Sequence, residues 1–211
     1  MGEIVDGKQV RIRFDGARCI HARNCVLGLP EVFKANVEGP WIDPDAATPE
    51  DLVAIATRCP SGAIQVERLD GGAGERPSGR TVVAVLENGP LAVRGTLTVA
   101  GQSEVRATLC RCGASKNKPY CDGSHVTASF TATGELPPAE SLPAWGAPGP
   151  VEVTPLPNGP LKVAGPHEIT SGTGHAAKRG DTAFLCRCGS SKNKPYCDGT
   201  HRAIGFDTGG R

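Results

Sequence analysis

The chain has 211 residues, a formal net charge of +1, and an unusual content of 28 glycines, 18 prolines and 9 cysteines. Only 4% of the residues are aromatic, so large side chains cannot build one thick core, and small units of this kind usually need metal or disulfide links. The balanced charge excludes a broad positive field, and we expect no nucleic-acid partner. No stretch approaches the ~18 apolar residues that span a bilayer, so we expect no membrane partner either.

The cysteines favour metal binding over disulfide bonding. Their number is odd, and the first ten residues lack the apolar segment of an export signal. We therefore expect a reducing cytoplasm, where clustered cysteines indicate metal binding or catalysis. They fall into three groups of three, which are separated by segments rich in glycine and proline: Cys19, Cys25 and Cys59; Cys110, Cys112 and Cys121; Cys186, Cys188 and Cys197.

The first group lies in a segment with alternating β and α patterns. Val10 to Phe14 alternates apolar and polar residues and predicts a strand. Thr48, followed by proline and two acids, predicts the start of a helix whose apolar face ends at Cys59. Pro60 ends this helix, and residues 63–66 are predicted to be extended.

The spacing of Cys19, Cys25 and the Cys59-Pro pair resembles a bacterial ferredoxin reduced to one cluster. Such ferredoxins use C-x2-C-x2-C and a distant Cys-Pro, but Ala22 stands where the middle cysteine belongs. The resemblance to the divergent single-cluster ferredoxin domain implies one iron–sulfur cluster here, and the three cysteines match the three irons of a 3Fe-4S cluster. The alternatives are a 4Fe-4S cluster completed by His21, or a site that is vacant or filled by zinc.

Two segments without an apolar period read as linkers, and they divide the chain into three units. The predicted division is a ferredoxin-like domain at 1–69, a linker at 70–80, a second unit at 81–132, a linker at 133–150 and a third unit at 151–211.

The second and third units repeat one another. The segment from Cys110 to His125 recurs from Cys186 to His201 with only two differences, which indicates one supersecondary unit used twice. In the first copy, residues 82–86, 91–99 and 105–110 are predicted to be strands, with a turn at 88–90. Asp122 is predicted to cap a short helix that carries the histidine.

Each repeat spaces its candidate ligands as Cys-x-Cys, then a third cysteine, then a histidine four residues later. The third cysteine and the histidine project from one face of a starting helix. Three soft thiolates and one imidazole suit either an iron–sulfur cluster or zinc. The sets are Cys110, Cys112, Cys121 and His125 in the first copy, and Cys186, Cys188, Cys197 and His201 in the second.

Both copies resemble the signature of the CDGSH iron–sulfur family at every defined position. The resemblance implies a 2Fe-2S cluster in each copy, with His125 or His201 as the single nitrogen ligand. Members with one motif form homodimers, so a chain with two motifs is expected to be a monomer with an internal pseudo-dimer. A structural zinc site is the alternative for each copy.

The expected fold is α+β: a small ferredoxin-like domain, then a pseudo-two-fold pair of β-rich CDGSH units with short cluster-binding helices. We expect electron transfer to a redox partner protein, because a ferredoxin-like domain fused to two CDGSH sites supplies an internal relay; histidine ligation raises the reduction potential and is compatible with this function and with its rival. The rival function is cluster transfer or storage, or redox or iron sensing, with an apo-protein as cluster acceptor. A purely structural zinc protein is a third possibility.

No enzymatic activity is expected, because no cysteine is left over as a nucleophile and no carboxylate pair or serine motif indicates hydrolysis. The segment from Gly172 to Ala177 is similar to a dinucleotide fingerprint, but it lacks a surrounding βαβ unit. His167 and His175 have no cysteine partners at ligand spacing and are expected at the surface.

Overall fold

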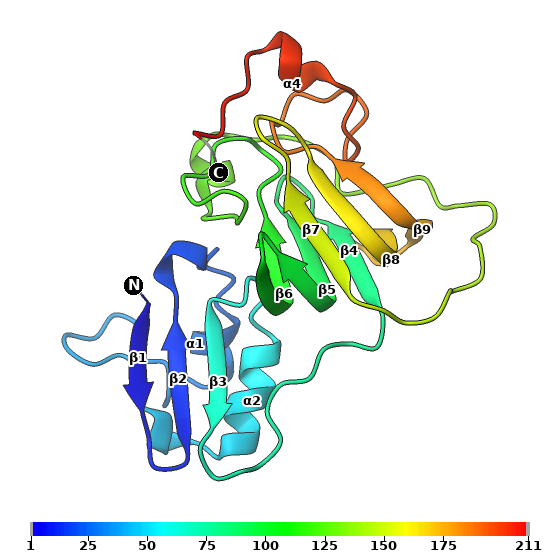
Figure 1. Ribbon diagram of the computed structural model, residues 1–211. Helices are drawn as coiled ribbons and strands as arrows, with labels where there is room; N and C mark the ends of the chain where they lie inside the picture. Colours follow the sequence, from blue (N-terminus) through cyan, green and yellow to red (C-terminus); the bar gives the residue numbers. More distant parts are fainter. Residues whose placement is uncertain (1, 210–211) are drawn as a thin grey trace. The chain divides into compact units, whose positions relative to one another are not determined.

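The computed structural model describes residues 2–209 (Figure 1). Residue 1, where the first predicted domain begins, and residues 210 and 211, where the last one ends, lie outside the described residues. The chain divides into two compact units, one up to Arg76 and one from Pro77 onward. The two units are described separately.

The first unit is a three-stranded antiparallel sheet with short helices. Its strands pair in the order β1 (Glu3–Asp6), β2 (Val10–Phe14) and β3 (Ile64–Arg68), so the predicted strand at residues 10–14 is confirmed. Its helical segments are η1 (Gly16–Arg18), α1 (Asn24–Gly28), η2 (Pro44–Ala46) and α2 (Pro49–Thr57).

Helix α2 begins as its sequence predicts. The hydroxyl oxygen of Thr48 accepts a hydrogen bond from the backbone N–H of Asp51 at 3.2 Å, and Pro49 occupies the first turn. The apolar face of α2 packs on the sheet, where Ile12, Leu52 and Ile64 are fully buried. This packing holds the residues after α2, including Cys59, near the end of β2.

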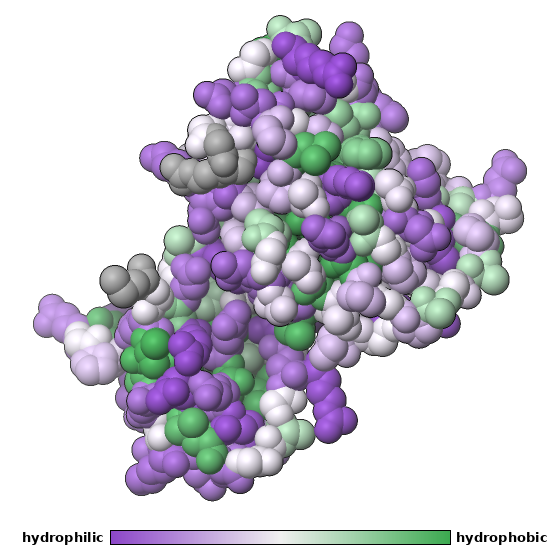
Figure 2. Space-filling model, in the orientation of Figure 1, coloured by the Kyte–Doolittle hydropathy of each residue, from purple (hydrophilic) through white to green (hydrophobic). Residues whose placement is uncertain are grey.

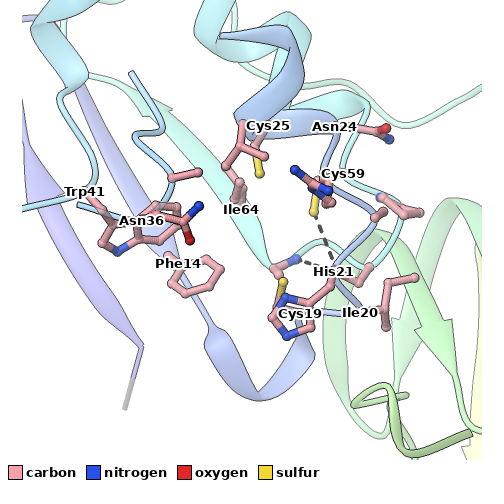
Figure 3. Close-up of a pocket in the computed structure, with 17 residues that line it drawn as sticks. Phe14, Cys19, Ile20, His21, Asn24, Cys25, Asn36, Trp41, Cys59 and Ile64 are labelled. Atoms are coloured by element: carbon pink, nitrogen blue, oxygen red, sulfur yellow. Dashed lines mark hydrogen bonds between the residues drawn. The ribbon is translucent and has the colours of Figure 1, made fainter. Parts of the chain in front are cut away.

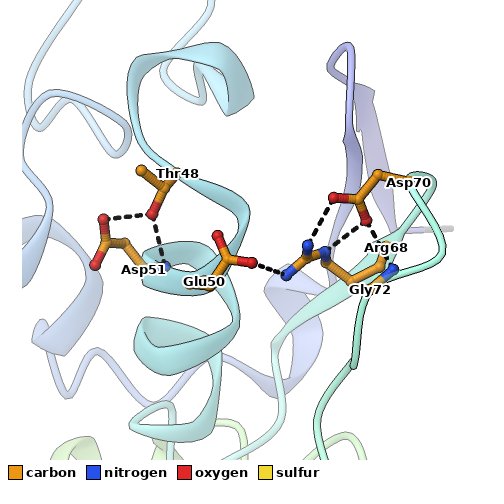
Figure 4. A network of polar contacts seen from close by, with 6 residues as sticks. All are labelled: Thr48, Glu50, Asp51, Arg68, Asp70 and Gly72. Atoms are coloured by element: carbon orange, nitrogen blue, oxygen red, sulfur yellow. Dashed lines mark hydrogen bonds and ion pairs between the residues drawn. The ribbon is translucent and has the colours of Figure 1, made fainter.

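A polar network ties strand β3 to the first turn of α2 (Figure 4). Arg68 donates to Glu50 at 2.8 Å and to both carboxylate oxygens of Asp70, at 2.7 and 2.6 Å. These hydrogen bonds hold the pKa of Asp70 down to about 2, with a further contribution from the backbone N–H of Gly72.

The second unit is one six-stranded sheet with two single-turn helices. Its elements are β4 (Thr81–Val85), β5 (Leu91–Val99), β6 (Gln102–Leu109), α3 (Ser124–Thr127), β7 (Val151–Pro155), β8 (Leu161–Ser171), β9 (Ala176–Leu185) and α4 (Thr200–Ala203). The whole chain is thus mostly β with a few short helices, which confirms the β-rich second part of the predicted α+β fold.

The two sequence repeats are interleaved in this sheet. Within each repeat the strands pair antiparallel, as β4–β5–β6 and as β7–β8–β9. Strand β4 also pairs parallel with β8, and β7 pairs parallel with β5, so each repeat donates its first strand to the other. The pairings β5–β4–β8–β7–β5 form a closed ring, with β6 and β9 outside it.

The core of this sheet consists of small β-branched and leucine side chains. Val83, Leu91, Leu109, Leu161 and Leu185 are all fully buried, and they come from both repeats. The face shown in Figure 2 is mostly hydrophilic, with apolar residues in small separate groups. Because the buried side chains of both repeats form one cluster, neither repeat has a separate core. A shared core suits a chain with few large aromatic side chains.

Two minor expectations have different outcomes. His167 was expected at the surface but is only 2% exposed, because β8 runs on past the first bulge and carries it between β4 and β9. The segment that is similar to a dinucleotide fingerprint is the turn between β8 and β9, where Gly174 has a φ of +96°.

Within residues 2–209, no helix has both the length and the apolar composition to cross a bilayer.

Candidate metal centres

The three cysteines of the first unit line one cavity of about 470 Å³ (Figure 3). The sulfur atoms of Cys19, Cys25 and Cys59 are turned toward this cavity, and His21 and Ala22 are also part of its wall. Its volume far exceeds the ~30 Å³ share of one water molecule, so it has room for more than a single ion. The structure thus brings together the cysteines that the sequence placed in one site.

The loop from Cys19 to Cys25 winds tightly around the cavity. Cys19 follows η1 directly, and Cys25 lies in the first turn of α1. Between them, His21 and Arg23 have φ angles of +55° and +61°, which lie in the left-handed region that most side chains avoid. These two residues lie among the five that separate Cys19 from Cys25, and they turn the chain back on itself. Both cysteines therefore line the same cavity as Cys59.

Two hydrogen bonds fasten this loop to the segment that carries Cys59. The guanidinium of Arg18, which is only 7% exposed, donates to the carbonyl of Ser61 at 3.0 Å. The amide of Asn24 donates to the carbonyl of Arg58 at 2.7 Å. These bonds on either side of Cys59 hold the three cysteines in one arrangement. Sequence reasoning missed both donors.

The thiols of this cavity are partly buried. Burial raises the pKa of Cys19 and of Cys25, and the negative charge of Cys59 raises both further. Thiols with a raised pKa, such as those of Cys19 and Cys25, are poor nucleophiles but suitable metal ligands, because a bound cation removes the energetic penalty on their thiolates.

In the first CDGSH repeat, the four predicted ligands form two close pairs. The sulfur atoms of Cys110 and Cys112 are 3.8 Å apart, and the sulfur of Cys121 lies 3.3 Å from Nδ1 of His125. Two thiolates that bind one tetrahedral metal at ~2.3 Å lie about 3.8 Å apart. Each pair therefore has the spacing of two ligands on one metal atom.

The second repeat reproduces this arrangement. Cys186 and Cys188 are 3.8 Å apart, and Cys197 lies 3.3 Å from Nδ1 of His201. Among residues 2–209, no three His, Cys, Asp or Glu side chains converge as they would around a single ion. Each repeat thus presents the same two close pairs of candidate ligands.

Asp122 holds the loop between the two ligand pairs of the first repeat through hydrogen bonds to its backbone. The carboxylate of Asp122 accepts from the backbone N–H of Lys116 at 2.8 Å and from that of Ser124 at 3.0 Å. Burial opposes its ionisation, but these hydrogen bonds outweigh burial and hold the pKa of Asp122 below its ordinary value. Asp122 was predicted to cap helix α3, but Gly123 occupies that position, with a φ of +86°.

The ionisation of the first set is uneven. The contact with Cys112 and burial raise the pKa of Cys110, whereas the same contact lowers that of Cys112 to about 7. Burial raises the pKa of Cys121 to about 11 and lowers that of His125. The site thus favours a neutral imidazole, which is the form that binds a metal.

The two cysteine segments meet beyond the ends of β6 and β9. Cys112 and Cys188 form an antiparallel backbone bridge, so one ligand of each repeat is joined directly to one of the other. The residues between the paired cysteines, Arg111 and Arg187, are 1% and 0% exposed. The sequence contained a signal for them, because the same arginine occurs at the same place in both copies.

Comparisons with known proteins agree with this division into sites. Residues 5–69 match a family described as a divergent 4Fe-4S mono-cluster, and residues 88–126 and 158–202 match the iron-binding zinc finger of CDGSH type. The uncharacterized protein YjdI of Escherichia coli K12 is 36% identical over 59 residues, which cover 28% of this chain and 76% of that protein.

A CDGSH iron-sulfur domain-containing protein 2 homolog of Drosophila virilis is 59% identical over 29 residues, which cover 14% of this chain and 22% of that protein. No solved structure matches. The chain belongs to the CDGSH domain family, with two CDGSH units that follow an N-terminal divergent 4Fe-4S mono-cluster domain. Its domains are therefore iron–sulfur binding domains.

Proposed function

We propose that the chain is an electron carrier with three iron–sulfur clusters and no catalytic site of its own. Each CDGSH unit would hold a 2Fe-2S cluster on three cysteines and one histidine. The observation that carries this proposal is the division of each ligand set into two pairs, at 3.8 Å and 3.3 Å, repeated in both units. When bound, such clusters supply reversible one-electron transfer at a potential raised by the neutral ligand.

The chain's own residues prepare these sites for a bound core. Backbone N–H groups of Ala114 and Gly123 donate to the sulfurs of Cys112 and Cys121, each at 3.4 Å, which stabilises their negative charge. The ammonium group of Lys118 donates to the carbonyl of Ser115 at 2.6 Å and holds the loop closed. A preformed loop lowers the reorganisation that electron transfer would otherwise require.

For the first unit we propose a 3Fe-4S cluster on Cys19, Cys25 and Cys59. Three thiolates face the cavity, and Ala22 supplies no ligand atom at the fourth corner. The alternative is a 4Fe-4S cluster, to which the name of the matching family points and which His21 would complete. Electron paramagnetic resonance of the isolated protein distinguishes them, because an oxidised 3Fe-4S cluster is paramagnetic and an oxidised 4Fe-4S cluster of this type is silent.

All nine cysteines lie outside disulfide bonds, which supports a reducing compartment such as the cytoplasm. A soluble redox protein is the proposed partner, and the interleaved repeats support a monomer. The test is to reduce the purified protein with dithionite, remove the excess, and mix it with oxidised cytochrome c. A rapid rise of the visible α band of reduced cytochrome c is expected, together with return of the oxidised spectrum of this chain. A reduced protein that transfers no electrons would contradict the proposal.

Cluster donation is a second candidate, which one observation favours. His125 and His201 are partly exposed and lie in single-turn helices without a side-chain cap, so their side of each site is the less firmly held. Mixing the loaded protein with an apo-ferredoxin and following which protein holds the iron decides between the two. Iron that stays with this chain while electrons move supports the carrier.

A further inference from the structure

Two fully buried arginines lie at the centre of the second unit. Arg111 separates Cys110 from Cys112, and Arg187 has the same place in the other repeat. Each arginine is the immediate neighbour of two candidate ligands, and each guanidinium is enclosed by protein, because the residues are only 1% and 0% exposed.

Arg111 is held by neutral acceptors. It donates four hydrogen bonds of 2.6 to 3.2 Å, and its guanidinium lies 5.3 Å from the centre of the Phe130 ring. The acceptors are the backbone carbonyls of Leu86, Gly89, Ala132 and Thr133. Arg187 likewise donates to Gly159 and Leu156 and lies over Phe206.

A buried charge needs more than hydrogen bonds to neutral groups. Removing a cation from water is energetically costly unless a negative charge lies nearby. Within residues 2–209, Arg111 forms no ion pair with a carboxylate. Burial lowers its pKa, and the negative charges that oppose this are those of Cys186, Glu87 and Cys112, in that order.

Arg187 of the second repeat interacts in the same way with a cysteine of the first repeat. Burial lowers the pKa of Arg187, and the negative charge of Cys110 opposes this effect. The backbone bridge between Cys112 and Cys188 explains why each arginine interacts with a cysteine of the other repeat, because it joins the two cysteine segments directly. Each arginine is thus placed to interact with thiolates of the opposite repeat.

We propose that Arg111 and Arg187 are counter-charges for the metal centres, each acting mainly on the centre of the opposite repeat. This inference rests on the proposed function. One-electron reduction by an external donor adds a negative charge to a centre that three thiolates already make negative. A fixed positive charge in a medium of low dielectric constant favours this added charge, so each arginine raises the reduction potential of the centre that it faces.

The two repeats differ in how far this positive charge is offset. Glu87 acts on Arg111, whereas Pro157 stands at the corresponding place beside Arg187. The centre of the second repeat, which faces Arg111, therefore receives less net positive charge than that of the first. The two CDGSH centres consequently have different potentials, despite identical ligands, with the second one lower.

The experiment is a reductive titration of the loaded protein with dithionite and mediators, followed by visible absorbance. Four variants are compared with the natural chain: Arg111→Gln, Arg111→Lys, Glu87→Gln and, as a control that removes an exposed charge from β8, Lys162→Gln. Arg111→Gln should lower the potential of one titration step, Arg111→Lys should leave it nearer the natural value, and Glu87→Gln should raise the same step. His201→Cys should identify that step as the second centre.

Equal shifts for Arg111→Gln and Arg111→Lys would overturn the proposal, because they would show that lost hydrogen bonds and not lost charge move the potential. If Arg111→Gln fails to retain iron, Glu87→Gln decides: a raised step supports the proposal, and an unmoved step overturns it. Iron and sulfide are counted first in each sample. A natural chain without clusters refutes the proposed function, whereas loaded clusters with unmoved potentials refute only this inference.

Discussion

Gly113 packs directly against the backbone carbonyl of Cys188, and a methyl group on its α-carbon would collide with that carbonyl. Gly189 has the same relationship with the carbonyl of Cys112. Both glycines have left-handed backbone, with φ angles of +83° and +84°. The two cysteine segments can therefore form their bridge only because the residue after each Cys-x-Cys lacks a side chain.

Gly113→Ala should destabilise the second unit strongly. Left-handed backbone alone costs a residue with a side chain roughly 1–2 kcal/mol, and the collision with Cys188 adds to this cost. Gly123→Ala is the matched control, since its φ is +86° but nothing lies within 4 Å of the added carbon. Urea unfolding of both variants measures the difference, and equal free energies would show that the bridge tolerates a side chain.

Arg68→Met should lower the melting temperature of the first unit, because it breaks the link between β3 and the start of α2 (Figure 4). The Arg68 side chain is only 9% exposed, so its bonds are less screened than those of an open surface pair. Arg13→Met is the control, since the ion pair of Arg13 with Glu67 is half exposed on both sides. Calorimetry should find little change for Arg13→Met, and an equal change in both variants would contradict this account.

His167 should make the second unit less stable in acid. Burial lowers its pKa, and of the charges that act on it, Asp181 opposes the shift and Lys178 adds to it. The unfolded chain takes up a proton near the ordinary pKa of ~6.5, so this contribution to stability is complete above that pH and is lost as the pH falls. The urea midpoint should therefore fall less between pH 7.5 and 5.5 in His167→Asn than in the natural chain. Equal slopes would show that His167 does not titrate on unfolding.

His125→Cys and His201→Cys should each lower one reduction potential and make one centre more resistant to acid. A thiolate adds negative charge, which disfavours reduction, and it is a softer ligand for iron than imidazole. Loss of visible absorbance after a jump to pH 5 measures the resistance. The double variant is decisive, because unchanged loss of colour there would mean that histidine is not the acid-sensitive ligand.

Cys19→Ser should remove one paramagnetic species and leave the absorbance of the other two centres intact. The reason is that Cys19 lines a cavity made only of first-unit residues. Cys110→Ser is the reciprocal variant and should leave the first-unit signal unchanged. Loss of all three centres in either variant would show that the first unit and the CDGSH unit do not assemble independently.

The sequence predicted the local features well, because local residues determine them. Strand β2, strand β5 and the cap of α2 by Thr48 follow from alternation and capping chemistry within a few residues. The structure also brings together residues that the spacing grouped, as the pair Cys110 and Cys112 and the pair Cys121 and His125. The helix cap at Asp122 was wrong by one residue, because its carboxylate instead joins Lys116 to Ser124 across the loop.

The interleaving of the two repeats could not be read from the sequence in the same way. Exchange of β4 and β7 depends on pairings between residues far apart in the sequence, such as Val83 with Ile169 and Leu97 with Val151, and no local pattern records them. The burial of Arg111 was missed for a similar reason, since its carbonyl partners lie in two distant segments. The sequence pattern around Arg111 does not show that these two segments enclose it.

Counting iron and acid-labile sulfide per chain tests the central claim most directly. Two-metal centres in both CDGSH units predict about four irons and about four sulfides from those units, and the first unit adds about three or four irons and about four sulfides. Anaerobically purified protein should therefore be coloured and contain about seven or eight irons per chain. Colourless protein with about one zinc per ligand set and no sulfide would contradict the account.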